Sequence, residues 1–201
     1  MTKPNYTNAA EMERNLRRHM KSGNTKALVH QLVMIRISGI RPLSWLPLFQ
    51  ELLEKRRNDD IIRHTCVIVE DYGSKAERCL PRLIELSDRC IAPIDAVWAI
   101  TKDCRLVLPQ MGRYVERFPE EACDLICQIG PDAADLVPHI IKVLGRDDWD
   151  EMWAAVDALG AIGPKASVAL PILRKLRKHK SGVISSRATI AIASIAQGNE
   201  I

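Results

Sequence analysis

Basic or titratable side chains recur at fixed distances after five regularly spaced prolines. The prolines are Pro47, Pro81, Pro109, Pro138 and Pro171. Eight residues after them stand Lys55, Arg89, Arg117, Arg146 and His179. Four residues after them stand Glu51, Glu85, Arg113, Lys142 and Lys175, and one residue after them Leu48, Arg82, Gln110, His139 and Ile172. Cations gathered in this way can bind an anionic partner by charge complementarity, without any reaction.

Only one of these columns has a purely structural explanation. A cation in the last turn of a helix opposes the helix dipole and contributes about 0.3–1 kcal/mol, which favours Lys or Arg eight residues after each proline. It does not explain Arg113, Lys142 and Lys175, which come one turn earlier. The net charge of +4 is low for a dedicated nucleic-acid-binding protein. The pattern therefore favours an anionic partner, without showing which kind.

Two tryptophans, Trp149 and Trp153, lie one helical turn apart beside a run of acidic residues. The acidic residues are expected to cap the start of a helix. Tryptophan is enriched among interface residues, so we expect one of the pair to pack in the core and the other to contact a partner. The predicted partner-binding residues are Arg82, Arg89, Arg113, Arg117, His139, Lys142, Arg146, Trp149, Trp153, Lys175 and His179.

Six cysteines are spread along the chain without the close pairing of a metal site. Only Cys123 and Cys127 are four residues apart, on one expected helix face, and nothing elsewhere completes a ligand set. Cysteines that form no disulfide are commonly buried, so we predict reduced thiols that pack in the core. No phosphate-binding glycine loop and no nucleophile motif occurs. We therefore expect no metal, no cofactor and no catalytic residues.

The five prolines belong to an internal repeat with intervals of 34, 28, 29 and 33 residues. A period of about 20–50 residues is typical of solenoids, in which each unit packs against its neighbours. Apolar residues stand one before, two after and five after each proline. They are Leu46, Leu80, Leu108, Val137 and Leu170, then Phe49, Leu83, Met111, Ile140 and Leu173, then Leu52, Leu86, Tyr114, Val143 and Leu176. Steps of three place these side chains on one stripe of a helix, and the basic columns on its solvent side.

A second helix is predicted upstream of each proline. A glycine or a residue in its place lies eight positions before each proline, namely Gly39, Gly73, Thr101, Gly130 and Gly163. Glycine adopts the left-handed conformation that ends a helix, and proline after a short turn fits the start of the next helix. Each repeat is therefore predicted to be an antiparallel pair of helices.

Two of these units carry a family resemblance. Ala158-Leu159-Gly160-Ala161-Ile162-Gly163-Pro164, followed by Leu170-Pro171, resembles the short HEAT repeat of the phycobilisome-lyase type, and residues 128–138 are similar to it. The resemblance covers about residues 25–197. It implies an all-α, right-handed solenoid of about five helix pairs, with the pre-glycine helices convex and the post-proline helices concave. The basic columns would then line the concave groove.

The composition agrees with one elongated domain. The chain is 47% apolar but only 4% aromatic, which suits a core of Leu, Ile, Val and Ala between stacked helices. We predict an N-terminal capping segment over residues 1–24, with a helix over 8–21, and a single repeat domain over 25–201 that ends in a helix over 182–197. No apolar run approaches the roughly 18 residues of a membrane span. A cytoplasmic protein that contacts no membrane is expected.

Three function classes remain open. The first is a non-catalytic solenoid that grips an acidic protein in its concave groove, as an adaptor or as an immunity-type inhibitor. The second is a nucleic-acid-binding relative of the alkylpurine DNA glycosylases built on HEAT-like repeats, with Trp149, Trp153 and Asp150 as candidate site residues. The third is a chromophore-lyase-like protein. No histidine is followed by Glu, which excludes the HEAT-type deoxyhypusine hydroxylase with its iron-binding His-Glu pairs.

Overall fold

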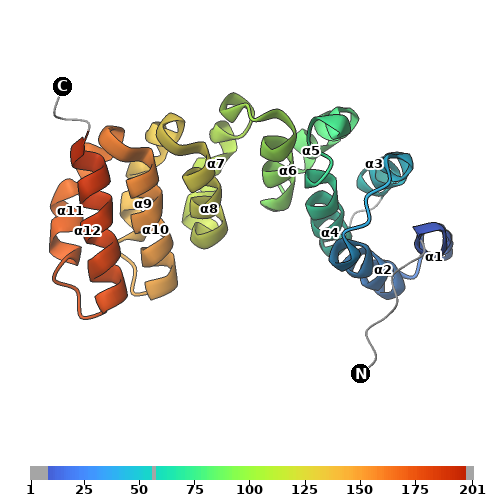
Figure 1. The fold of residues 1–201 in the computed structure, drawn as a ribbon, viewed down its shortest axis with the longest axis horizontal. Coiled ribbons are helices and arrows are strands. Elements are labelled where there is room, and N and C mark those ends of the chain that lie inside the picture. Colours follow the sequence, from blue (N-terminus) through green and yellow to red (C-terminus); the bar gives the residue numbers. More distant parts are fainter. Residues whose placement is uncertain (1–8, 56–57, 198–201) are drawn as a thin grey trace. The chain divides into compact units, whose positions relative to one another are not determined.

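The computed structural model describes residues 9–55 and 58–197, and in these ranges every regular element is a helix (Figure 1). The chain divides into two compact units, Met1–Asp103 (unit 1) and Cys104–Ile201 (unit 2), and each is described by itself. The prediction of an all-α repeat architecture is confirmed. A single domain over residues 25–201 stays a prediction.

Unit 1 consists of two layers of helices and one covering helix. Its elements are α1 (Ala9–Ser22), α2 (Thr25–Ser38), η1 (Leu43–Trp45), α3 (Leu46–Lys55), α4 (Asp59–Glu70), η2 (Gly73–Cys79), α5 (Leu80–Leu86) and α6 (Ala92–Thr101), where η marks a 3₁₀ helix. Helices α2, α4 and α6 pack in that order, α3 and α5 form the second layer, and α1 packs on α2. The helix predicted over residues 8–21 is therefore α1, and Asn8 lies outside the described residues.

Unit 2 repeats the same arrangement. Its elements are η3 (Cys104–Leu106), α7 (Leu108–Arg117), α8 (Pro119–Ile129), η4 (Gly130–Leu136), α9 (Val137–Val143), α10 (Trp149–Ile162), η5 (Gly163–Ala169), α11 (Leu170–Leu176) and α12 (Gly182–Ala196). Helix α10 packs between α8 and α12, while α7 packs on α9 and α11 on α12. The helix predicted over 182–197 is α12.

The five repeat prolines all stand at the second position of a helix, as the prediction requires. These helices are α3, α5, α7, α9 and α11. The core stripe is centred on the residues two positions after the prolines, all 0% exposed: Phe49, Leu83, Met111, Ile140 and Leu173. The flanking positions are less enclosed, since Leu46 and Leu176, for example, are half-buried. Burying a large apolar side chain contributes about 1.5–3 kcal/mol, so this stripe is the main source of stability in each helix pair.

The connection from glycine to proline differs from the short turn expected. Three of the repeats have a seven-residue 3₁₀ helix there, namely η2, η4 and η5. Ala76, Ala133 and Ala166, which lie three residues after the glycines of these repeats, are buried. Because a small side chain lets the backbone lie against the core, the segment stays close to the core instead of looping out, with a kink of non-helical backbone at Ala76 in η2 and at Ala166 in η5.

The residue predicted to take the place of glycine in the third repeat is wrong by one position. Thr101 is the last residue of α6, and Lys102 takes the left-handed conformation with φ 52°. The Thr101 hydroxyl donates to the carbonyl oxygen of Val97 at 2.8 Å and accepts from the N–H of Asp103 at 3.1 Å. This residue therefore stabilises the helix end from within the helix, and the chain turns after it.

The connection on the other side of each post-proline helix varies in length. Only Phe118 separates α7 from α8, whereas five residues, 144–148, separate α9 from α10. The spacing from glycine to proline is eight residues in the four repeats that have the glycine, and the third repeat has seven residues from Lys102 to Pro109. The repeat therefore changes length in the turns after the post-proline helices and in the helices that follow, as α8 and α10 show with 11 and 14 residues.

Two further sequence expectations need comment. Cys66, Cys79 and Cys123 are buried as predicted, but Cys127 is exposed, because α8 turns its Cys123 side to the core and its Asp124 and Gln128 side to solvent.

The stretch Trp149–Leu176 is long and apolar enough by composition to span a membrane. In the structure it is three successive elements, α10, η5 and α11, with non-helical backbone at Ala166.

The start of α10 provides a test of the local capping argument. The Asp148 carboxylate accepts from the N–H groups of Asp150 at 3.0 Å and Glu151 at 3.2 Å. We expect Asp148→Ala to lower the free energy of unfolding by about 0.5–2 kcal/mol, measured by urea denaturation. The matched control is Asp147→Ala, which removes the same charge from an exposed neighbour that caps nothing and should change stability by less than about 0.5 kcal/mol. Equal losses in the two variants would show that charge, not capping, is responsible.

Candidate partner-binding surfaces

The structure divides the predicted partner-binding residues between the two units. Arg82 lies on α5 of unit 1 and Arg89 in the turn after it. The others belong to unit 2, on α7, α9, α10, α11 or the turns after α9 and α11: Arg113, Arg117, His139, Lys142, Arg146, Trp149, Trp153, Lys175 and His179. Their placement in a concave groove stays a prediction.

Several of the predicted cations bind carboxylates of their own chain. Lys142 Nζ donates to Glu116 Oε1 at 2.8 Å, and His139 Nδ1 lies 3.0 Å from the same oxygen. These hydrogen bonds, with that of Lys142 the stronger, hold the pKa of Glu116 below its ordinary value. Arg146 donates to Glu151 Oε2 at 3.0 Å and to the backbone oxygen of Glu116 at 2.5 Å. Lys142 and Arg146 at the α7–α9 edge are therefore already paired with carboxylates of the chain.

The same use of arginine occurs in unit 1. Arg89 Nη2 donates to Asp59 Oδ1 at 2.6 Å, thirty residues upstream. Arg82 donates to the backbone oxygen of Leu53 at 3.1 Å and to Glu85 at 2.7 Å. Arg82 and Arg146 thus join successive repeats, and Arg89 joins the two ends of its own repeat. The spacing pattern did not distinguish these roles from partner binding.

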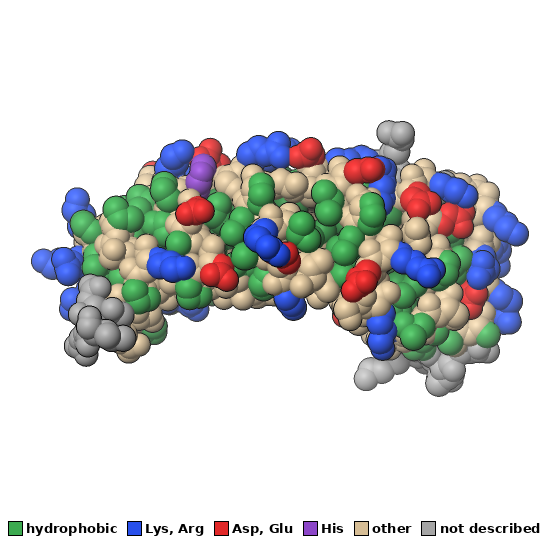
Figure 2. Space-filling model, turned by 90° about the horizontal axis from the view of Figure 1, so that it is seen from above, with side chains coloured by type: hydrophobic (Ala, Val, Ile, Leu, Met, Phe, Trp, Pro, Cys, Tyr) green, Lys and Arg blue, Asp and Glu red, His purple; other side chains and the backbone are tan. Residues whose placement is uncertain are grey.

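An uncompensated cluster of cations lies at the end of α11. We call residues 174–180 the basic segment, and its exposed cations are Arg174, Lys175, Arg177, Lys178 and Lys180. None of them forms an ion pair with a carboxylate in the part of the chain that the structure describes. Figure 2 shows Lys and Arg side chains at the end formed by the C-terminal helices, and others spread over the rest of the same face.

The backbone of the basic segment is fixed by hydrogen bonds from α12 and its cap. Ser185 Oγ donates to the backbone oxygen of Arg177 at 2.7 Å, and the N–H of Ser181 donates to His179 Nδ1 at 3.1 Å. The His179 ring meets Trp149 edge-on, with 5.8 Å between the ring centroids, and Lys180 Nζ lies 5.1 Å from the Trp149 ring. The basic segment and Trp149, which is 48% exposed, therefore form one surface.

The expectation that one tryptophan packs in the core is wrong, because Trp153 is also exposed, at 40%. Its Nε1 donates to Asp157 Oδ2 at 2.9 Å, and the guanidinium of Arg187 on α12 lies 4.3 Å from its ring centroid. Arg187 also forms an ion pair with Asp157. The indole ring of Trp153 stays at the surface because Arg187 covers its face and Asp157 accepts a hydrogen bond from its N–H.

Carboxylates surround the exposed ends of α8 and α10. We call Glu120, Glu121 and Asp124 of α8, with Asp150 of α10, the acidic face; all four are exposed. Loss of hydration, together with the neighbouring carboxylate of Asp150, raises the pKa of Glu120. Asp150 and the two tryptophans, the candidates for a glycosylase site, thus lie at a solvated surface. Among the described residues, no group of three or more His, Cys, Asp or Glu side chains is arranged to hold a metal ion.

One group with an unusual environment escaped the sequence analysis. Burial, reinforced by the carboxylates of Asp95 and then Asp71, raises the pKa of Glu70 in unit 1 to about 8. Nearby, Lys102 Nζ lies 5.0 Å from the ring of Trp98, whose Nε1 is buried without a hydrogen-bond partner in the structure. Glu70 stands three residues before its glycine, and the equivalent positions are Arg36, Trp98, Cys127 and Gly160. Because the residues at this position of the repeat share no chemical character, the sequence pattern does not single out Glu70.

The comparisons with known proteins bear on the fold. No protein-family model and no curated protein matches the sequence. A designed armadillo repeat protein in complex with the peptide (KR)4 is 17% identical, with a TM-score of 0.65 over 92% of this chain and 98% of that one. A second designed armadillo repeat protein is 16% identical (TM-score 0.61, 92% and 98% covered), and an engineered protein is 14% identical (TM-score 0.66, 94% and 97% covered). The chain has the fold of a helical repeat solenoid.

The environment of Glu70 predicts an unusual pH dependence of stability. The folded protein keeps its proton up to about pH 8, whereas the unfolded chain releases it near the ordinary value of 4.5. Since the folded state binds more protons in this interval, this carboxyl lowers stability as the pH rises from 4.5 to about 8. We expect Glu70→Gln to gain stability relative to the wild type on going from about pH 5 to about pH 9, as measured by urea denaturation.

The control for this experiment is Glu77→Gln, at an exposed position of η2 in the same unit. Its stability curve should run parallel to that of the wild type. A parallel curve for Glu70→Gln as well would contradict the assignment.

Proposed function

We propose that this protein is a non-catalytic, protein-binding solenoid that holds an acidic segment of its partner. The observation that carries the proposal is the basic segment: five exposed cations within residues 174–180, none paired with a described carboxylate, beside the half-exposed ring of Trp149. Two proteins of similar fold are designed armadillo repeat proteins, and one of them is in complex with a peptide. Their fold supports a surface for an extended chain.

The arrangement suits recognition for two physical reasons. The Ser185 hydroxyl holds the backbone of the basic segment at Arg177 and the Ser181 N–H holds the His179 ring, so little conformational entropy is lost when a partner binds. Trp149 offers a flat apolar contact beside the cations of the basic segment, of which Lys180 lies on its ring. Interfaces of this kind take most of their affinity from a few aromatic anchors and their association rate from complementary charge.

Several finer points belong to the same proposal. We propose that the repeats around Gly130 and Gly163 are short HEAT repeats, that Arg113, Lys142 and Lys175 line a concave groove with the basic segment, and that the protein acts in the cytoplasm. The roles of adaptor and of immunity-type inhibitor are both compatible with this surface. Finding the gene beside one for a toxic enzyme would favour the second.

The proposal predicts that Lys175→Glu combined with Lys178→Glu weakens binding of an acidic peptide. A labelled (DE)4 peptide should bind the wild type at low salt and lose at least about tenfold in affinity with this double variant. The control is Lys26→Glu with Lys75→Glu, which makes the same charge change at exposed lysines of unit 1 and should leave most of the affinity. Fluorescence anisotropy measures both.

A nucleic acid is the partner that this experiment could reveal instead. Duplexes of unrelated sequence should show no binding at physiological salt. The contrary result is duplex binding at micromolar or lower concentration, with a slope of log K against log salt of about −0.9 for each phosphate contacted. If the Lys175→Glu, Lys178→Glu variant no longer bound the duplex, a nucleic acid would be the partner in place of a protein.

A second candidate function is recognition of a basic segment, and the environment of Trp153 favours it. The chain's own Arg187 already lies on this ring and pairs with Asp157, so the surface accommodates a guanidinium. The acidic face of α8 lies on the neighbouring helix and supplies further carboxylates. A Lys- or Arg-containing peptide would find the same two kinds of group there.

The (KR)4 peptide separates the two candidates. If the acidic face is the binding surface, (KR)4 binds in place of (DE)4, and Glu120→Gln with Asp124→Asn weakens it at least about tenfold. Asp132→Asn with Asp135→Asn, at two exposed carboxylates of η4, is the matched control. Our first proposal predicts that (KR)4 does not bind.

A further inference from the structure

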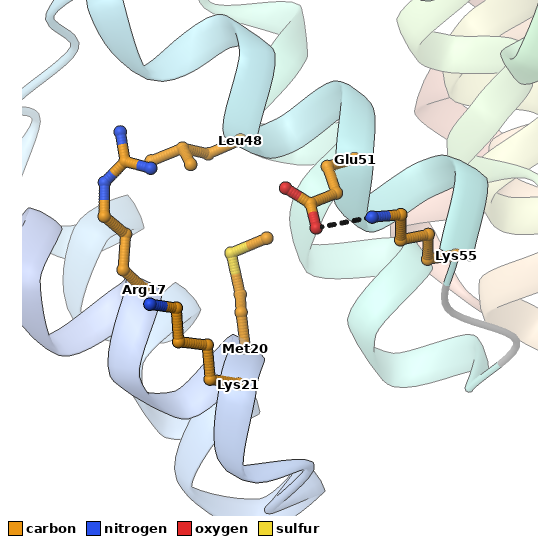
Figure 3. A pocket seen from close by; sticks show the side chains of 6 residues that line it. All are labelled: Arg17, Met20, Lys21, Leu48, Glu51 and Lys55. Carbon is orange, nitrogen blue, oxygen red and sulfur yellow. Dashed lines mark hydrogen bonds and ion pairs between the residues drawn. The ribbon is translucent and has the colours of Figure 1, made fainter.

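A pocket of about 360 Å³ opens in unit 1 between the capping helix α1 and helix α3 (Figure 3). Arg17, Met20 and Lys21 line it from α1. From α3 it is lined by Leu48, Glu51 and Lys55. Its volume falls in the lower part of the range of ligand sites, about 300–1,000 Å³.

The lining combines an apolar floor with a cationic rim. Met20 extends from α1 toward α3 and ends between Leu48 and Glu51 (Figure 3). Glu51, the only carboxylate among the described residues of the lining, is bound by Lys55 at 2.9 Å. Lys21 forms no ion pair with a carboxylate in the described ranges. The pocket thus has positive charge to spare around an apolar base.

The cationic rim continues along α1. A second, more open depression of about 550 Å³ shares Arg17 and Lys21 with the pocket and is otherwise lined by Arg14, Arg18 and Ser22. Arg14 and Arg18 have no ion pair with a described carboxylate. The nearby carboxylate of Glu13 is already occupied, since it accepts from Arg17 at 2.8 Å and from Trp45 Nε1 at 3.0 Å.

A capping helix needs a polar outer surface, but it does not need one sign of charge. Solvation of the outer face of α1 would be served equally by both signs, and mixed charges would also avoid self-repulsion. Here Arg14, Arg18 and Lys21 repel one another on adjacent turns. Such a cluster is stabilised when an anion binds it, because the anion removes the repulsion and adds charge-assisted hydrogen bonds.

We infer that this pocket and the adjoining face of α1 bind an acidic peptide segment that carries one aliphatic side chain. The aliphatic side chain lies on Met20 and Leu48, and carboxylates on either side of it bind Lys21, Arg17 and Arg18. A purely polar anion would leave the floor unused, and a purely apolar ligand would leave the cations uncompensated. The site belongs to unit 1 and does not depend on the basic segment of unit 2.

The test uses the full chain and the peptide Asp-Asp-Leu-Asp-Asp. Arg18→Glu with Lys21→Glu reverses two cations that hold no described ion pair, so the fold should be retained, as checked by the thermal midpoint. We expect this variant to weaken binding of the peptide at the pocket at least about tenfold, as measured from the amide chemical shifts of Met20 and Leu48, which report this site and not the basic segment. Lys26→Glu with Lys75→Glu, at exposed lysines outside the pocket, should leave the affinity within about twofold.

Two further arms keep the outcome specific. Replacing the leucine of the peptide by serine should weaken binding several-fold and remove the amide chemical-shift changes at Met20 and Leu48. Unchanged affinity for the serine peptide would reject the apolar floor. If Lys175→Glu with Lys178→Glu removes all binding while Arg18→Glu with Lys21→Glu has no effect, the pocket is not a site and only the proposal for unit 2 stands. The reverse result overturns that proposal and retains the pocket.

Discussion

Burial of one apolar side chain two residues after each repeat proline is the constraint on which the rest of the structure depends. Phe49, Leu83, Met111, Ile140 and Leu173 are completely enclosed. In a repeat stack each of these side chains is enclosed by its own repeat and its neighbours, so no core residue has to contact a distant part of the chain. The outward sides of the helices are therefore released from packing. They can carry charge of either sign without cost to the fold.

Long cations use this freedom in two different ways. Four arginines each bind a group that lies thirty residues away in the sequence, and these bonds link the stacked helices at several points along the chain. They are Arg41, Arg89, Arg146 and Arg187. Exposed ion pairs of this kind contribute about 0–1 kcal/mol each, and they act more on the register of the stack than on its total stability. The cations of the basic segment and of α1 have no such partner among the described residues. The spacing of these cations along the sequence does not show which of them bind another part of the chain. That depends on where the neighbouring repeat places its carboxylates.

The elements of the fold were predictable because their signals are local. A proline at the start of a helix, a glycine near its end and apolar residues in steps of three act within one or two turns. The seven-residue 3₁₀ segments were not predictable, since they depend on how closely Ala76, Ala133 and Ala166 approach the core. The same holds for the pairing of Lys142 with Glu116 and for the environment of Glu70. The carboxylates of Glu70 and Asp95 lie on different repeats, and only the packing of α4 on α6 brings them near each other. The exposed position of Trp153 likewise depends on Arg187, thirty-four residues further along the sequence.

The unequal freedom of the two connections in each repeat has a consequence for how such a protein diversifies. In three of the repeats the segment from glycine to proline is tied to the core by a buried alanine, namely Ala76, Ala133 or Ala166. The connection after each post-proline helix ranges from the single residue Phe118 to the five residues 144–148 and carries no such tie. An insertion, a deletion or a new side chain at that edge would leave the buried stripe of the stack unchanged. Trp149 and the basic segment both lie at this edge, where natural variation can change the partner and leave the scaffold intact.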